Sequence, residues 1–292
     1  MDRRRFLSVV ARGVPALALV GVARARQRRI AFTRAEMAGF LARARVLESS
    51  VLSTGITGSR LAIMSDGTLT HRVHVQHVDE RHAVYQGPRG AYLNFRDSYV
   101  YNLAASHLDE LLGLGMVPVA VEREIDQRAA AVSWWVDDVL MTERERFEQE
   151  VRPPDPDLWA RQLFCVRIFD ALIHNIDRNA GNIVITRDWA LWMIDHTRAF
   201  RPEPRLLNPE GLMRCDRWLL TALEGLTADR LREAVGREIG DPGIDGLLER
   251  RDAIVAMVAE RRAASGDDVA LFEYLPRPDS VEAVFDDPPS GA

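Results

Sequence analysis

The feature that most constrains this chain is an ordered set of polar side chains around a short apolar hairpin. An apolar helix is predicted over 158–174, and the loop after it carries Asp177 and, five positions later, Asn182. Two apolar strands are predicted within 183–194, and Asp195 ends the second of them. Because strands on either side of a short turn pair with one another, the hairpin would fix the separation of Asn182 and Asp195.

These three side chains are suited to metal-assisted phosphate chemistry. Phosphoryl transfer needs Mg²⁺ to bridge phosphate oxygens and a carboxylate to orient or accept the proton of the nucleophile. Asp177 stands on a loop just after a buried helix, so it can project into a cleft, and we assign it as the catalytic base. Asn182 and Asp195 offer the hard oxygen ligands that Mg²⁺ prefers. Each residue alone is typical of a turn or a cap, but the three at this spacing favour a phosphoryl-transfer site.

The same residues resemble the catalytic centre of protein-kinase-like enzymes. The step from Asp177 to Asn182 is that of the kinase loop H-R-D-x-x-x-x-N. Residues 177–182 are similar to the D-R-H-x-x-N loop of phosphatidylinositol kinases and of the secreted and HipA-type atypical kinases, and 102–113 are similar to the helix-C segment of the secreted ones. The resemblance implies an α+β, two-lobed fold with a β-rich N-lobe and a helical C-lobe. It also implies ATP and Mg²⁺ (or Mn²⁺) as cofactors, with Asp195 as the D-F-G aspartate.

The chain departs from the family pattern at three positions. Asn179 replaces the usual histidine of the loop. His174 lies one residue too far from Asp177 to match the histidine of H-R-D, so its role is not carried over. His196 follows Asp195 where D-F-G has phenylalanine, which leaves the metal-binding residue itself in place.

The chain contains no lysine, because all 38 of its Lys-plus-Arg residues are arginines. Kinases normally use the lysine of a V-A-I-K strand to pair with phosphates, and the matching strand here carries Gln76 at that position. Glutamine cannot supply the charge. Arg60, Arg72 and Arg96 are candidates to replace it, with Asp97 as an acidic partner near the start of the helix-C segment.

Two further segments are candidates for nucleotide binding. In the stretch before the strand at 60, Gly55 and Gly58 would let backbone amides approach phosphates, with Ser59 beside them; an ordinary β-turn is the alternative. Trp135 and Val136 would form a hinge that packs the adenine and offers backbone hydrogen bonds, and aromatic core packing is the alternative.

The order of predicted elements favours two lobes. Strands precede helices, and we assign 33–151 to the N-lobe and 157–275 to the C-lobe, with the proline-rich segment 152–156 as the boundary. The tail 276–292 is rich in proline and aspartate, which favours disorder.

Several local signals define individual elements of the N-lobe. Thr33 and Glu36 predict a capping box at the start of a helix, and Asp66-Gly67 predicts a hairpin turn. Asp97 or Ser98 is expected to cap a helix that runs to Leu112.

The bulk composition excludes some classes of protein. The 292 residues are 47% hydrophobic, which is enough for a sizeable core, and the formal net charge of −5 argues against an electrostatic nucleic-acid binder. Residues 1–25 fit a twin-arginine signal: Arg3 to Leu7 matches R-R-x-F-L, an apolar run covers 9–22, and 23–25 is A-x-A-like. Export to the periplasm is expected. The alternative is an N-terminal arm of a cytoplasmic protein, and the run is too short and interrupted for a stable transmembrane anchor.

The leading hypothesis is therefore an ATP- and Mg²⁺-dependent phosphotransferase that acts on a protein, lipid or small-molecule acceptor. The first alternative is a pseudokinase that binds a nucleotide or a partner as a regulatory module, which the missing lysine favours. The second is a nucleotidyl transferase that moves AMP on the same fold. The intact Asp177, Asn182 and Asp195 favour catalysis.

Overall fold

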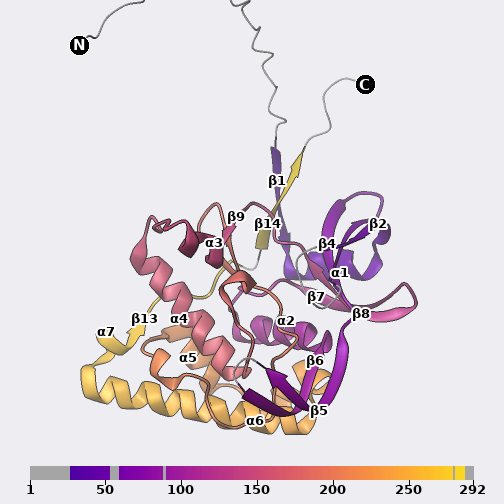
Figure 1. Cartoon of the computed structure of the whole chain (residues 1–292). Coiled ribbons are helices and arrows are strands. Elements are labelled where there is room, and N and C mark those ends of the chain that lie inside the picture. Colours follow the sequence, from indigo (N-terminus) through magenta and orange to yellow (C-terminus); the bar gives the residue numbers. More distant parts are fainter. Residues whose placement is uncertain (1–26, 53–58, 88–89, 279, 287–292) are drawn as a thin grey trace, which may run out of the picture.

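The computed structural model describes residues 27–52, 59–87, 90–278 and 280–286 (Figure 1). The predicted signal segment 1–25 lies outside these residues, as do Gly55 and Gly58 of the predicted phosphate loop. The described residues form a β-rich lobe followed by a helical lobe, so the expected α+β, two-lobed architecture is confirmed.

The first lobe is built on an antiparallel five-stranded sheet with the order β2-β3-β4-β8-β7. Its strands are β2 (Arg45–Val51), β3 (Arg60–Ser65), β4 (Thr70–Gln76), β7 (Ala120–Ile125) and β8 (Arg128–Trp134). Helix α1 (Arg34–Arg43) packs on one face and begins with the predicted Thr33–Glu36 capping box. Val73 and Val75 of β4 are fully buried in the core shared with α1. Alternation along the strand therefore puts His74 and Gln76 on the opposite face.

A long hairpin is inserted between β4 and β7 and is missing from the sequence-based expectations. It consists of β5 (Asp79–Gly87) and β6 (Gly90–Ser98), which pair antiparallel and extend away from the five-stranded sheet (Figure 1). Its last residue, Ser98, donates its backbone N–H to the carbonyl of Thr197 at 2.8 Å. The hairpin is thereby joined to the segment that follows Asp195.

Helix α2 (Val100–Leu112) connects the two lobes and ends, as expected, at Gly113, whose φ of 66° is left-handed. The expected cap at its start is wrong. The N-cap is Tyr99, with no side-chain hydrogen bond, because the carboxylate of Asp97 is instead bound to Arg198.

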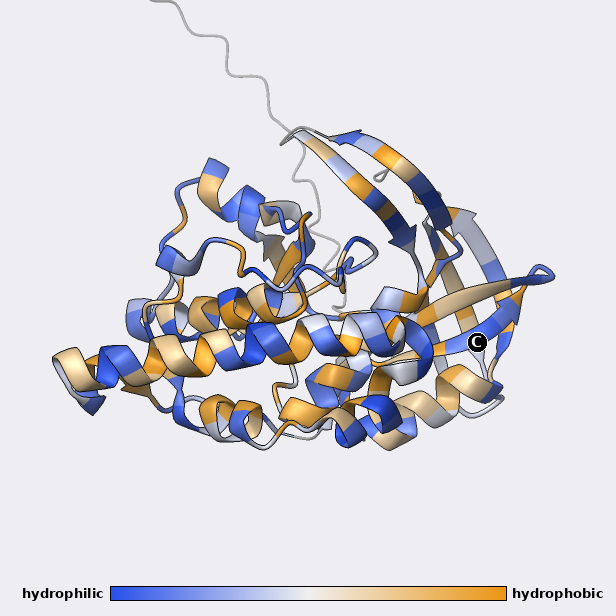
Figure 2. Cartoon of the chain, turned by 90° about the horizontal axis from the view of Figure 1, so that it is seen from below, coloured by the Kyte–Doolittle hydropathy of each residue, from blue (hydrophilic) through white to orange (hydrophobic). Residues whose placement is uncertain are grey.

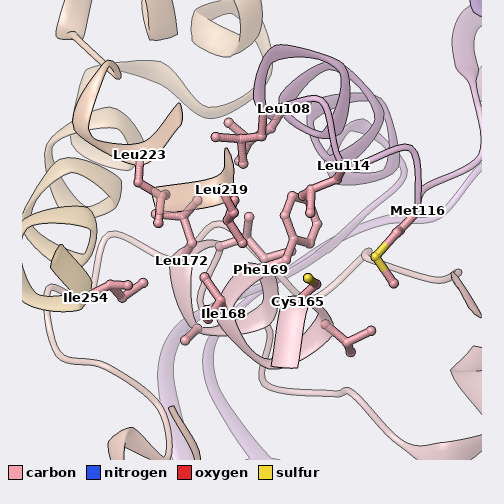
Figure 3. Close-up of a cluster of buried hydrophobic side chains, with 14 of the residues drawn as sticks. Leu108, Leu114, Met116, Cys165, Ile168, Phe169, Leu172, Leu219, Leu223 and Ile254 are labelled. Atoms are coloured by element: carbon pink, nitrogen blue, oxygen red, sulfur yellow. The ribbon is translucent and has the colours of Figure 1, made fainter. Parts of the chain in front are cut away.

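The second lobe is organised around α4 (Pro156–Leu172), whose N-cap is Asp155. Leu108, Leu114, Phe169 and Leu219, contributed by three parts of the chain, meet in its core (Figure 3). The other helices are α3 (Glu143–Glu148), α5 (Arg217–Glu224), α6 (Ala228–Ser265, kinked at Gly240) and α7 (Asp267–Ala270). The long helix α6 carries both hydrophilic and hydrophobic residues along its length, as expected for a helix with one face in a core (Figure 2).

Small sheets complete this lobe. One has the order β11-β10-β9, from β9 (Val139–Thr142), β10 (Ile183–Thr186) and β11 (Leu191–Met193). In another, β12 (Cys215–Asp216) pairs in parallel with β13 (Leu271–Phe272). Short 3₁₀ turns, η1 (Ala180–Asn182) and η2 (Pro209–Gly211), lie in the connecting loops.

The chain leaves the five-stranded sheet at Trp134, and β9 pairs with β10 of the helical lobe. Within the proline-rich segment 152–156, the prolines at 153 and 154 lie between α3 and α4, and Pro156 is the first residue of α4. The assignment of 152–156 as the boundary between the lobes stays a prediction.

The tail also differs from its expected disorder. Residues 280–286 form β14 (Ser280–Asp286), which pairs antiparallel with β1 (Gln27–Thr33), and the two strands lie side by side in Figure 1. Ala283 is fully buried in the core of the first lobe. Its pairing partner lies some 250 positions away in the chain, so no local pattern indicates the strand. Among the described helices, none is both long and apolar enough to cross a bilayer.

A buried arginine links three segments of the helical lobe. Arg250 of α6 is fully buried, and its Nε donates to the carbonyl of Leu172 at 2.7 Å. Its Nη1 donates to the carbonyls of Arg201 (3.0 Å) and Glu203. One side chain thus ties α6 to the end of α4 and to the loop after Arg198.

Replacement of Arg250 by alanine is expected to destabilise the protein by about 2–4 kcal/mol, because it leaves buried carbonyls without donors. The measurement is the free energy of unfolding in urea. The matched control is Arg205→Ala, whose side chain is 86% exposed and pairs with Glu203, and a change within about 0.5 kcal/mol is expected there. Equal losses in the two variants would contradict this role.

Candidate active site

Arg178 holds the predicted catalytic loop to the predicted metal-binding hairpin. Its Nη1 donates to the carbonyl of Asn182 at 2.8 Å and to the carbonyl of Ile194 at 2.7 Å. The backbone N–H of Ile194 also donates to the carbonyl of Asn182, at 3.1 Å. The residue that precedes Asp195 is therefore fixed directly against Asn182.

The other side of the same guanidinium is bound to helix α4. Its Nε and Nη2 donate to the two carboxylate oxygens of Asp170, at 2.9 and 3.1 Å, and both side chains are largely buried. Asp170 also accepts from the Nδ2 of Asn175 at 3.0 Å, and the Oδ1 of Asn175 accepts from the backbone N–H of Asp177 at 3.1 Å. This bidentate pair positions the loop that carries Asp177 relative to the helix before it.

The three predicted residues keep side chains that are open to a ligand. The carboxylate of Asp177 is 43% exposed and forms an ion pair with Arg198. Asp195 is exposed, and its Oδ1 accepts from the hydroxyl of Thr197 at 3.1 Å. Within the described part of the chain, no hydrogen bond engages the carboxamide of Asn182, which is half-buried.

The backbone of Asp195 is itself unusual. Its φ of 55° lies in the left-handed region, which non-glycine residues seldom adopt. Such a conformation persists only where the surroundings impose it, and it is common at functional sites. Here the next residue supplies the restraint, because the N–H of His196 donates to the Oδ1 of Asn102 on α2 at 2.8 Å.

His196 acts as a core residue in place of the phenylalanine of D-F-G. It is buried against the edge of the Phe169 ring. Burial, with the neighbouring charge of Arg178, lowers the pKa of His196 well below its usual range, so the ring is neutral. His174 turns away from the site, since its Nδ1 contacts the carbonyl of Arg205 at 3.1 Å.

The β-rich lobe faces the site with neutral polar groups. Burial lowers the pKa of His74 on β4, while the carboxylate of Asp195 acts in the opposite direction, so the two side chains are electrostatic neighbours. Gln76 is buried on the same face of β4. Its Nε2 donates to the hydroxyl of Ser59 at 3.0 Å. The structure thus brings together Gln76 and Ser59, which stands next to the undescribed segment 53–58.

Trp135 and Val136 lie where the chain passes between the lobes, after β8 and before β9. Trp135 is partly buried, and its N–H makes a long hydrogen bond of 3.4 Å to the carbonyl of Arg72. Trp134, one residue earlier, is the core tryptophan, stacked on His71 at a centroid distance of 3.9 Å. The position of Trp135 and Val136 therefore suits a hinge, and Trp134 is the tryptophan that packs in the core.

The three arginines considered as lysine replacements are engaged elsewhere. Arg96 donates to the Oδ1 of Asp79 at 3.1 Å and lies over the ring of Tyr101. Arg72 pairs with Asp137 at 2.8 Å. Arg60 donates to the hydroxyl of Ser49 at 2.8 Å. None of these four contacts is with Gln76 or Ser59, and the assignment of Arg96 to nucleotide binding stays a prediction.

Sequence reasoning missed Arg198 altogether. Its guanidinium contacts both Asp177 and the buried Asp97, which lies 101 positions away in the chain. No local pattern could reveal that pairing. Asn179 was noted only as a replacement for histidine, yet its Oδ1 accepts from Arg144 at 2.9 Å and from the N–H of Gly181 at 3.0 Å, which shapes the loop between Asp177 and Asn182.

The arrangement fits a divalent cation with phosphate oxygens. One exposed carboxylate and one carboxamide with an unengaged oxygen lie on adjacent, rigidly joined backbones, and hard cations prefer such ligands. Magnesium commonly binds through one or two protein oxygens, with phosphates and water completing its shell.

Comparisons with known proteins bear on the fold of the chain. The sequence matches no protein-family profile and no curated protein sequence. Among solved structures, the chain is similar to the Golgi casein kinase, with a TM-score of 0.55 and 11% sequence identity over 82% of this chain and 77% of that one. It is also similar to CtkA, a proinflammatory kinase of Helicobacter pylori, with a TM-score of 0.45 and 9% identity over 78% of this chain and 98% of that one. The chain therefore has a two-lobed fold like that of the Golgi casein kinase.

Proposed function

We propose that the protein is an ATP- and Mg²⁺-dependent phosphotransferase. The observation that carries this proposal is the Arg178 contact, which joins the backbones of Asn182 and Ile194 and holds Asp177 on the same rigid loop. Phosphoryl transfer depends almost entirely on positioning and on electrostatic stabilisation. A rigid set of one base and two oxygen ligands meets that requirement.

Each residue of the set has a distinct proposed role. Asp177 orients the acceptor hydroxyl and accepts its proton, for which its partly exposed carboxylate is suited. Asn182 and Asp195 hold the divalent cation, Mg²⁺ or Mn²⁺, which would neutralise charge on the transferred phosphate. His196 is buried, and its backbone N–H is held by Asn102, so it supports the backbone of Asp195.

The β-rich lobe contributes to nucleotide binding without a lysine. We propose that Gln76 and Ser59 offer hydrogen bonds to the phosphates, and that Trp135 and Val136 border the adenine. The supporting observations are the Gln76–Ser59 hydrogen bond and the place of residues 135–136 at the crossing between the lobes. With no fixed charge from Gln76, the cation has to balance more of the phosphate charge.

The substitution Asp177→Asn is expected to lower the rate of Mg-ATP-dependent label transfer by at least about 10²-fold, because it removes the base while keeping the shape of the side chain. Asp195→Asn is expected to abolish transfer and also to remove the thermal stabilisation given by Mg-ATP, because it weakens a metal ligand. The assay follows ³²P from γ-labelled ATP into protein, water or added acceptors.

The matched control for both variants is Asp229→Asn, since the carboxylate of Asp229 is 94% exposed and distant in sequence from the site. Its transfer rate is expected to stay within about 2-fold of the unmodified chain, as surface substitutions usually do little. Label transfer that persists in both Asp177→Asn and Asp195→Asn would exclude the assigned roles.

A pseudokinase remains the second candidate because the buried Gln76 stands where a lysine is expected. The catalytic proposal predicts both thermal stabilisation by Mg-ATP and turnover of γ-labelled ATP. Stabilisation of several degrees without turnover would instead support a nucleotide-binding module. Parallel assays with α-labelled ATP separate these outcomes from AMP transfer, which alone would place the α-phosphate on the acceptor.

We also propose export through the twin-arginine route, which rests on the R-R-x-F-L match at residues 3–7 and the A-x-A-like site at 23–25. Replacement of Arg3 and Arg4 by lysine is expected to retain the full-length chain in the cytoplasm. The measurement is fractionation of cells that express a C-terminally tagged chain. Export that persists in the double variant would exclude the twin-arginine route, and an unmodified chain found in the cytoplasm would favour a cytoplasmic protein.

A further inference from the structure

We propose that Arg198 is a positioning residue for the catalytic base, and that through it the β5–β6 hairpin determines where the carboxylate of Asp177 points. This inference rests on the phosphotransferase role proposed above for Asp177. It adds a residue and a structural element that lie outside the motif at 177–195.

The guanidinium of Arg198 bridges two carboxylates. Its Nε donates to the Oδ2 of Asp97 at 2.6 Å, and its Nη1 donates to the Oδ2 of Asp177 at 3.1 Å. The side chain of Asp97 is 3% exposed, whereas that of Asp177 is 43% exposed. The contact with Asp97 is therefore the fixed one, and the contact with Asp177 is the one that a ligand can reach.

The hairpin supports the same guanidinium from a second direction. Arg198 lies over the rings of Phe95 and Tyr85, with its central carbon 5.6 and 5.9 Å from their centroids. These two rings stack on each other across the strands at 4.0 Å and 15°. Because a planar cation is attracted to the face of an aromatic ring, the ring pair restricts the orientation of the guanidinium as well as its position.

An arginine is needed for this combination of contacts. Its fork directs separate N–H groups at two carboxylates while its flat face remains available for stacking, and it stays charged at all relevant pH values. A lysine ammonium is a single point charge on a flexible chain, so it cannot hold Asp97 and Asp177 and cover the rings at once.

The arrangement restrains the base through one carboxylate oxygen. The Nη1 of Arg198 donates to the Oδ2 of Asp177 at 3.1 Å. The backbone hydrogen bond from Ser98 to Thr197 closes the link between the hairpin and the residue before Arg198. Displacement of a catalytic group by about 1 Å can cost 10²-fold in rate, so loss of this restraint has a measurable effect.

The chain offers a close control in Arg201. It follows Arg198 by three positions and also contacts the hairpin, because its Nη2 donates to the carbonyl of Leu93 at 2.7 Å and its guanidinium lies over Tyr92. Both of these contacts are with β6 of the hairpin. The pair Arg198→Met and Arg201→Met therefore separates a link to the base from a simple loss of hairpin contacts.

The test compares the unmodified full chain with Arg198→Met, Arg198→Lys and Arg201→Met in two assays. The first measures kcat and KM for Mg-ATP by release of labelled phosphate to water. Arg198→Met and Arg198→Lys are expected to lower kcat about 10- to 100-fold, with KM for ATP changed less than about 3-fold. Arg201→Met is expected to retain kcat within about 3-fold.

The second assay measures amide hydrogen exchange in the peptides that cover 79–98 and 175–182, and it does not depend on activity. Arg198→Met is expected to raise exchange in both peptides, and Arg201→Met only in the hairpin peptide. Exchange at 175–182 that is unchanged in Arg198→Met would overturn the proposal, as would full kcat in that variant. An unmodified chain without ATP turnover would count against the proposed function, while the exchange result would still decide whether Arg198 couples the hairpin to the loop.

Discussion

The contact between Arg178 and Asp170 is the interaction on which the candidate site depends. Its bidentate geometry anchors the loop after α4 to the helix itself. The Nη1 of the same guanidinium donates to the carbonyls of Asn182 and Ile194, at the two ends of the hairpin. Two largely buried charges are costly to remove from water unless they pair well and satisfy further hydrogen bonds. Here both conditions hold. The backbones that carry Asp177, Asn182 and Asp195 are consequently fixed relative to one another before any ligand binds.

The two lobes contribute unequally to this site. The helical lobe supplies the proposed base, both proposed metal ligands and the internal hydrogen bonds that hold them. The β-rich lobe presents neutral groups, with His74 beside Asp195 and Gln76 bonded to Ser59. The fold is similar to that of the Golgi casein kinase. Catalysis depends on whether a bound cation balances the phosphate charge in a site whose β-rich side is neutral. Both the catalytic and the pseudokinase proposals therefore expect nucleotide binding, and only the catalytic one expects turnover of ATP.

Local patterns predicted those elements whose causes are local. The capping box at Thr33, the turn at Asp66 and the hairpin at 183–194 depend on residues within a few positions of each other, and all three occur in the structure. The β5–β6 hairpin, the pairing of β14 with β1 and the pairing of β9 with β10 were missed. The last two depend on partners distant in the chain, where alternation within one strand carries no information about its neighbour.

The sequence by itself determined the order and spacing of Asp177, Asn182 and Asp195. It also determined that no lysine is present to pair with phosphates. It also determined the strand that carries Gln76. The tertiary structure decided what each arginine binds. Arg60, Arg72 and Arg96, the candidates to replace the lysine, bind Ser49, Asp137 and Asp79. Arg198 meets Asp177 because β6 brings the buried Asp97 beside it. The physical reason is that a guanidinium binds the carboxylates and aromatic rings that lie within its reach, and only the folded chain places them there.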